Sequence, residues 1–406
     1  MIKEVKINNF KSVADLTLPL SRFNVLIGSN GSGKSNILEA IAFGAAASAD
    51  KLDNEFLGAR GIRIANVHLM KSAFTKDGVL KPIQIDFQIG DKDVEFTLEY
   101  IEAPILKWII KEKEDISKFH DSFLPLLLLD IESHKNKLYT MPGGLGERFL
   151  IIKKDLDDAI RAGNVKQISE LISQIISKDS IDLYYSKQFG QNILSNFIIY
   201  SPEISSLRKF EEESQIKPLG VKGEGLFSIL QIFYESYGPE TIDEIRNYLH
   251  IIEWFDDFEA IFDKVSGRNS LVVKDRNMPG VTLNQTNVNE GFLYLLFYIS
   301  LIISKETPAF FAIDNIEAAL HPRLCEELIK NLVALSKTHN KQIILTTHNP
   351  FILDGLNLSD PEQKLFVVRR NGEGETIADD ISPIEGVKLS EAWMRGYIGG
   401  QPETIE

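Results

Sequence analysis

The sequence contains a single cysteine, Cys325, among 406 residues. One thiol excludes an intrachain disulfide and any zinc site built from several cysteines. No group of histidines and cysteines has the spacing of metal ligands, and no Gly-x-Ser-x-Gly motif or Cys/His pair is present. The sequence therefore does not indicate catalysis by a protein nucleophile.

Long apolar runs and an excess of basic charge are also missing. The longest apolar runs, 123–131 and 292–303, are shorter than the ~20 residues that a membrane-spanning helix needs. The N-terminal stretch MIKEVKINNF alternates like a strand and lacks the apolar core of a signal peptide. We therefore predict a cytoplasmic protein that does not enter a membrane. The net charge of −14 means that any contact with nucleic acid needs a local basic patch.

A glycine-rich loop is the clearest feature of the sequence. Residues 23–41 read FNVLIGSNGSGKSNILEAI, an apolar strand that leads through the loop into a helix. The pattern G-x-x-x-x-G-K-S predicts phosphate binding, because glycine N–H groups close around phosphate oxygens and the helix dipole adds positive charge. Lys34 is expected to reach the β- and γ-phosphates of ATP or GTP, and Ser35 to hold Mg²⁺. The predicted nucleotide-binding residues are Gly28, Ser29, Asn30, Gly31, Ser32, Gly33, Lys34, Ser35 and Asn36.

A second metal ligand is expected at the end of a buried strand, where two aspartates compete. Asp130 and Asp314 each follow four apolar residues. Only Asp314 is followed by a helical pattern and then by the apolar strand QIILTTH, which ends at His348. Strand, helix, strand is the order of a parallel sheet whose strand tips meet at a phosphate site. We therefore predict that Asp314 holds Mg²⁺ together with Ser35.

These segments together resemble the ABC-type ATPases of the RecF, SMC/Rad50 and OLD group. IKEVKINNFKSVADLTLPL and the glycine loop are similar to the start of those ATPase heads, and AIDNIEAALHPRL is similar to their metal-binding strand. TTHNPFIL resembles their switch-histidine segment. TNVNEGFLYLLFYISLI resembles a degenerate signature, in which Asn289, Glu290 and Gly291 take the positions of Ser-x-Gly.

The resemblance implies an α/β fold, namely an ABC-type P-loop ATPase head with a mixed sheet and an antiparallel β subdomain. Sequence patterns divide the chain into an N-terminal lobe (1–101), a mainly helical insertion (102–265) and a C-terminal lobe (266–406). The turn IGDKD (89–93) predicts a β-hairpin. No heptad pattern persists, so a long coiled-coil arm is not expected.

The resemblance also implies a homodimer or a higher even-numbered oligomer. Each ATP would lie between Lys34 of one head and the signature Asn289–Gly291 of another. Too few residues follow the predicted strand 364–370 for a nuclease domain, so any effector nuclease or toxin is expected to be a separate protein. The chain resembles the stand-alone ATPase subunits of the Septu and PARIS antiphage systems, which suggests a regulatory role. The alternatives are a RecF-like ATPase that clamps DNA and a scaffold that uses ATP only to assemble.

The residue after Asp314 sets the expected rate of hydrolysis. The resemblance places a catalytic glutamate there, but this chain has Asn315, which cannot accept a proton from water. General-base catalysis is typically worth ~10²–10⁴-fold, so hydrolysis is predicted to be slow. If the backbone stays extended, Glu317 points to the same edge and is a second candidate base. His321 is expected either at a dimer interface or as the cap of the next helix. The predicted catalytic residues are Lys34, Asp314, Asn315, Glu317 and His348.

Overall fold

The structure is a computed structural model that describes residues 1–74, 80–101, 107–110, 193–210, 218–262, 269–317, 320–383 and 386–401. Residues 1–109 and 193–406 form one compact unit. Asp130 and residues 111–192, the larger part of the predicted helical insertion, lie outside the described residues.

The described chain contains both strands and helices. The strands are β1 (Ile2–Phe10), β2 (Val13–Pro19), β3 (Phe23–Ile27), β4 (Ile83–Ile89), β5 (Lys92–Ile101), β6 (Lys107–Ile110), β7 (Ile199–Tyr200), β8 (Phe255–Phe262), β9 (Asn269–Asp275), β10 (Thr282–Leu283), β11 (Phe310–Ile313), β12 (Gln342–Thr347), β13 (Gln363–Arg370) and β14 (Thr376–Asp380). The helices are α1 (Lys34–Ser48), α2 (Asn54–Gly58), α3 (Val67–Met70), α9 (Ile204–Leu207), α10 (Leu226–Ile232), the π-helix η3 (Phe233–Tyr237), α11 (Pro239–Leu249), α12 (Glu290–Ile303), α13 (Pro322–Thr338), the 3-10 helix η4 (Pro350–Gly355) and α14 (Leu389–Met394).

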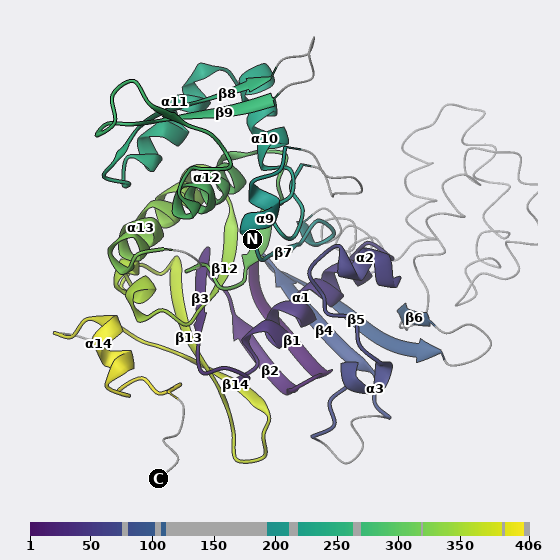
Figure 1. Cartoon of the computed structure of the whole chain (residues 1–406). Helices are drawn as coiled ribbons and strands as arrows, with labels where there is room; N and C mark the ends of the chain where they lie inside the picture. The colour runs from purple at the N-terminus through teal and green to yellow at the C-terminus, as the bar shows by residue number, and fades with distance from the viewer. Residues whose placement is uncertain are drawn as a thin grey trace, which may run out of the picture. The chain divides into compact units, whose positions relative to one another are not determined.

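A six-stranded mixed sheet forms the centre of the unit, in the order β14-β13-β3-β12-β11-β7 (Figure 1). Neighbouring strands are parallel except for the edge pair β13 and β14. Strands β3, β11 and β12 are buried at every position, as expected for parallel strands covered on both faces. Their apolar sequences are the reason that they could be recognised as strands.

Helices cover both faces of this sheet (Figure 1). On one side, α1 packs so closely on β4 that a Cβ atom added to Gly44 would lie 2.7 Å from the side chains of both Ile85 and Phe87. On the other side, α12 and α13 share one hydrophobic core with the central strands. Helix α12 is buried at every position from Gly291 to Ile303, which explains why its sequence is apolar all round.

A five-stranded sheet, in the order β2-β1-β4-β5-β6, lies on the far side of α1, and its strands β2, β1, β4 and β5 are antiparallel. Burial alternates along β4, with one face against the helix and one toward solvent. The predicted hairpin is confirmed: Ile89 pairs with Lys92 across a two-residue turn in which Gly90 has φ +64°. The two sheets confirm the predicted α/β class with a mixed sheet and an antiparallel subdomain.

The described residues from 193 to 262 contain both helices and strands. Strand β7 joins the central sheet, and β8 begins a three-stranded antiparallel sheet with β9 and β10. Only two residues of β7 are in the sheet, which is too short a run for any periodic pattern to appear in the sequence. The boundary predicted at residue 265 stays a prediction.

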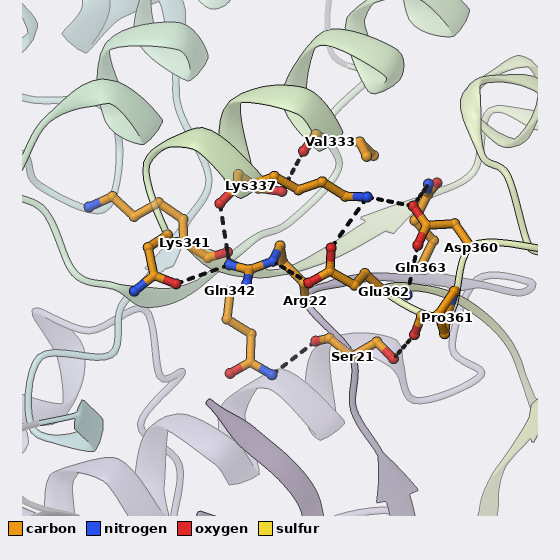
Figure 2. Close-up of polar contacts among 12 residues, drawn as sticks. Ser21, Arg22, Val333, Lys337, Lys341, Gln342, Asp360, Pro361, Glu362 and Gln363 are labelled. Atoms are coloured by element: carbon orange, nitrogen blue, oxygen red, sulfur yellow. Dashed lines mark hydrogen bonds and ion pairs between the residues drawn. The ribbon is translucent and has the colours of Figure 1, made fainter. Parts of the chain in front are cut away.

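Polar contacts gather where the chain enters the central strands (Figure 2). Arg22, just before β3, donates from Nε to Glu362, just before β13, over 2.8 Å. The buried side chain of Gln342 at the start of β12 accepts from the Ile2 N–H (2.8 Å) and donates to the Ile2 carbonyl (2.7 Å). These contacts fix β1, β3, β12 and β13 to one another at the amino ends of the central strands, opposite the carboxyl ends.

Within the described ranges, no helix is long and apolar enough to cross a membrane. The cytoplasmic location expected from the sequence stays a prediction.

Candidate functional site

The loop between β3 and α1 closes tightly because two of its positions, 28 and 33, are occupied by glycine, which has no side chain. Gly28 has φ +152° and Gly33 has φ +114°, backbone conformations that other residues rarely adopt. An added Cβ atom at Gly28 would lie 2.0 Å from the Val368 carbonyl oxygen, and one at Gly33 would lie 2.0 Å from Thr376 Oγ1. The loop therefore depends on glycine at both positions, as the sequence pattern predicts.

Side chains bind four carbonyl oxygens of this loop. Lys34 Nζ donates to two of them (2.9 and 3.1 Å), Arg370 Nε to a third (2.9 Å) and Thr376 Oγ1 to the fourth (3.0 Å). Carbonyl groups engaged in this way leave the backbone N–H groups at the start of α1 to receive an anion. In order along the loop, the four oxygens belong to Gly28, Ser29, Gly31 and Ser32.

The Asp314 carboxylate faces the first turn of α1. Its Oδ2 atom accepts a hydrogen bond from Ser35 Oγ over 3.3 Å, and its Oδ1 atom accepts one from Thr346 Oγ1. The same Thr346 oxygen accepts from the Asn315 N–H (2.9 Å). A serine hydroxyl beside a held carboxylate offers the hard oxygen ligands that Mg²⁺ prefers. The structure thus brings together Ser35 and Asp314, the predicted metal pair, and adds Thr346, which no sequence pattern indicated.

Asn315 lies outside the strand, in a left-handed backbone conformation with φ +56°. Strand β11 ends at Ile313, so the assumption that an extended backbone carries Glu317 to the same face is wrong. Asparagine adopts the left-handed region more easily than glutamate, because its short polar side chain can hydrogen-bond to the neighbouring backbone. The backbone therefore supplies a second reason, besides chemistry, for an asparagine at this position.

Glu317 nevertheless reaches the site through the turn after Asn315. Its Oε1 atom accepts from the His348 N–H over 2.8 Å, while its Oε2 atom is buried and has no hydrogen-bond partner among the described residues. Ser32 Oγ is also buried without a partner there. Buried polar atoms without partners are uncommon in proteins, and a bound polar ligand with its water would satisfy them. These two atoms fit a nucleotide and its metal ion.

His348 lies at the tip of β12 beside the loop. Interaction with the Gly28 backbone favours the protonated form of its imidazole and opposes a fall in its pKa. Partial burial and the charge of Lys34 lower the pKa of His348, while Glu317 and Asp314 oppose that shift. The predicted residues Lys34, Asp314, Glu317 and His348 therefore share one electrostatic environment at the carboxyl edge of the sheet.

Burial lowers the pKa of the Lys34 ammonium to about 8, and the carboxylates of Asp314 and Glu317 only partly offset this effect. The protonated form binds phosphate, so affinity for ATP should fall as the pH rises through 8. We expect about a tenfold loss between pH 7 and pH 9, as the protonated fraction drops from nine-tenths to one-tenth. Equilibrium titration with Mg-ATP across this range measures the effect. A Lys34→Arg variant keeps its charge and serves as the control, and an equally flat profile for the wild type would refute the assignment.

The signature-like residues lie elsewhere in the chain. Asn289 caps α12, its Oδ1 atom accepting from the Gly291 N–H over 2.7 Å. Asn289 and Glu290 are exposed, and Gly291 is buried. In the described part of the chain, no hydrogen bond or ion pair connects these three residues with residues 28–36.

His321 was expected at an interface or as a helix cap, and the contact observed is the cap. Its Nδ1 atom accepts from the Arg323 N–H (3.3 Å) at the start of α13.

A glycine loop at the tip of one parallel strand, with a serine facing an aspartate at the tip of another, is the arrangement of a P-loop nucleotide-binding site. Residues 1–353 match the family described as the AAA ATPase domain, and this span is most of the chain. The protein belongs to that family and is an ATPase by class.

Similar proteins are also found among curated sequences and solved structures. An uncharacterized protein of Methanocaldococcus jannaschii is 33% identical over 90 residues, which are 21% of this chain and 78% of that protein. The Smc head domain of Pyrococcus furiosus, solved with the C-terminal domain of ScpA, is 16% identical with a TM-score of 0.48, covering 94% of this chain and 96% of its own. The SMC head domain of Thermotoga maritima is 13% identical with a TM-score of 0.45, covering 94% and 99%. At these values the two head domains say nothing about the partners or activity of this chain.

Proposed function

We propose that the protein is a slow, ATP-gated regulatory subunit of a bacterial antiphage complex, and that it controls a separate effector such as a nuclease or toxin. The observation that carries this proposal is a complete phosphate and metal site with asparagine, at position 315, where the related heads carry a catalytic glutamate. Such a site binds ATP well and turns it over slowly. Long-lived ATP binding suits a switch better than a motor.

Each residue of the site has a role in this proposal. Lys34 would leave the loop carbonyls and bind the β- and γ-phosphates, while Ser35 and Asp314 would hold Mg²⁺. The bound metal ion would neutralise charge on the phosphates during hydrolysis. Asn315 would orient the attacking water without taking its proton. The Oε2 atom of Glu317, buried and without a hydrogen-bond partner among the described residues, would accept that proton, and His348 would lie beside the γ-phosphate.

The same proposal includes an ATP-dependent pair of heads. The exposed start of α12, with Asn289 and Glu290, carries N–H groups and a helix dipole suited to a phosphate on another molecule. ATP held between Lys34 of one chain and this helix start of its partner would contribute binding energy only to the closed dimer.

The test combines the mass of the complex with its composition. With Mg-ATP, we expect light scattering to show a mass twice that of the single chain. We also expect the chain to co-purify with the product of a neighbouring gene. A Lys34→Ala variant, which lacks the phosphate contact, should stay monomeric at the same ATP concentration. A wild-type chain that stays monomeric with ATP would refute the paired heads. ATP hydrolysis stimulated by duplex DNA, with DNA binding that weakens steeply with salt, would instead support the RecF-like alternative.

A further inference from the structure

The C-terminal segment 388–401 returns to the phosphate loop. In Figure 1 the yellow end of the chain, beyond α14, comes beside the loop that joins β3 to α1. Gly400 makes the contact, because a Cβ atom placed on it would lie 3.6 Å from Gly28 Cα and 2.6 Å from Val367 Cγ1. Nearly the whole length of the chain separates Gly400 from Gly28, yet the two backbones come close together at the first glycine of the loop.

This segment is held in place by specific contacts. Ser390 at the start of α14 donates from its N–H (3.0 Å) and Oγ (2.8 Å) to the buried carboxylate of Asp354 in η4. The side chain of Gln401 donates to the Trp393 carbonyl over 2.8 Å, which folds the tail back on α14. Because η4 begins two residues after His348, the segment connects the switch-histidine region with the phosphate loop.

The indole of Trp393 in this segment has a buried N–H group without a hydrogen-bond acceptor among the described residues. Its side chain is 6% exposed and packs in the main hydrophobic core. Its Nε1–H is buried and has no acceptor among the described residues, and it lies 3.6 Å from the Cβ position of Gly400. A buried donor without an acceptor is unfavourable and calls for an explanation, and one explanation is an acceptor that arrives in another state of the protein.

We propose that the C-terminal segment is part of the nucleotide site, in which Gly400 positions Gly28 and the Trp393 indole finds its acceptor only when a nucleoside triphosphate is bound. Gly28 is where the change occurs, since its carbonyl oxygen is now bound by Lys34 Nζ. When Lys34 turns to the phosphates, this carbonyl loses the Lys34 donor, and the loop beside Gly400 rearranges so that an acceptor reaches the Trp393 Nε1–H. Trp393 and Gly400 are positioning residues here, and the inference rests on the proposed binding of ATP.

Two neighbouring glycines offer a matched test. Gly399 and Gly400 both have φ +75°, so alanine strains the backbone equally at either position. An alanine methyl at 399 meets nothing within 4 Å, whereas one at 400 meets Val367 and the phosphate loop. We expect Gly400→Ala to bind Mg-ATP about tenfold more weakly than Gly399→Ala by calorimetric titration. Equal affinities in the two variants would overturn the role of Gly400.

A Trp393→Phe variant tests the indole donor separately. Phenylalanine keeps an aromatic ring in the core and removes the unpartnered N–H. Without nucleotide the variant loses no hydrogen bond, so this cause does not lower its melting temperature. The affinity for Mg-ATP should fall about threefold to tenfold, the range for one hydrogen bond, and ATP should raise the melting temperature less than in the wild type. Trp254→Phe, a tryptophan change next to β8, is the control. An unchanged ATP response in Trp393→Phe would overturn the inference, whereas a wild type that binds no ATP would overturn the proposed function as well.

Discussion

An Asp314→Asn variant is expected to hydrolyse ATP about 10²–10³-fold more slowly than the wild type, because a metal ion supplies several kcal/mol of transition-state stabilisation. The amide keeps the shape of the side chain. Its oxygen accepts one of the two hydrogen bonds from Ser35 and Thr346, and its NH2 group donates to the other hydroxyl oxygen, so the local fold should persist. The negative charge that attracts Mg²⁺ is lost. Phosphate release at saturating Mg-ATP measures the rate, and titration with and without Mg²⁺ shows whether the metal still strengthens ATP binding.

Asp360→Asn is the matched control for this change. Asp360 lies at the opposite edge of the central sheet, where its Oδ2 atom pairs with Lys337 Nζ over 2.7 Å (Figure 2). Lys337 and two further hydrogen bonds lower the pKa of Asp360 to about 2, so this carboxylate is also charged at neutral pH. The control should lose a little stability and keep its rate of hydrolysis. If Asp314→Asn hydrolyses ATP as fast as Asp360→Asn, Asp314 does not hold the metal.

The parts of the fold that could be predicted are those with a local cause. Strands β3, β11 and β12 were recognisable because strands buried on both faces are apolar throughout. Helix α1 begins at Lys34, where the phosphate-loop pattern places it, because the loop and the helix start are one structural unit. The competition between Asp130 and Asp314 could also be decided by the helix and strand that follow. Asp314 does lie beside Ser35, as predicted.

Contacts between distant parts of the chain had no signal in the sequence. Thr376 and Arg370 bind the loop from the β13–β14 hairpin, more than 300 residues away along the chain. Gly400 reaches Gly28 over a still longer separation. Threonine, arginine and glycine are common in turns and on surfaces, so their types alone do not indicate which loop they touch. Such pairings follow from the order of strands in the sheet, which a local pattern does not determine.

Asn315→Glu is expected to raise the steady-state rate of ATP hydrolysis at least tenfold, at the low end of the range for general-base catalysis. The left-handed backbone at this position complicates the change, because glutamate there is less stable than asparagine by about 1 kcal/mol. A lower melting temperature should therefore accompany the faster turnover. Phosphate release at saturating Mg-ATP and thermal unfolding without nucleotide measure the two effects independently.

Two further substitutions separate the chemical reason for asparagine from the backbone reason. Asn315→Gln has the size and backbone strain of the glutamate variant but no base, so it should lose stability without gaining speed. Asn315→Gly relieves the strain at φ +56° and likewise supplies no base, so it should leave the rate near that of the wild type. If the glutamate and glutamine variants hydrolyse ATP equally slowly, the missing base does not limit turnover. Asparagine would then be explained by the turn between Asp314 and Glu317, and slow hydrolysis would need another cause.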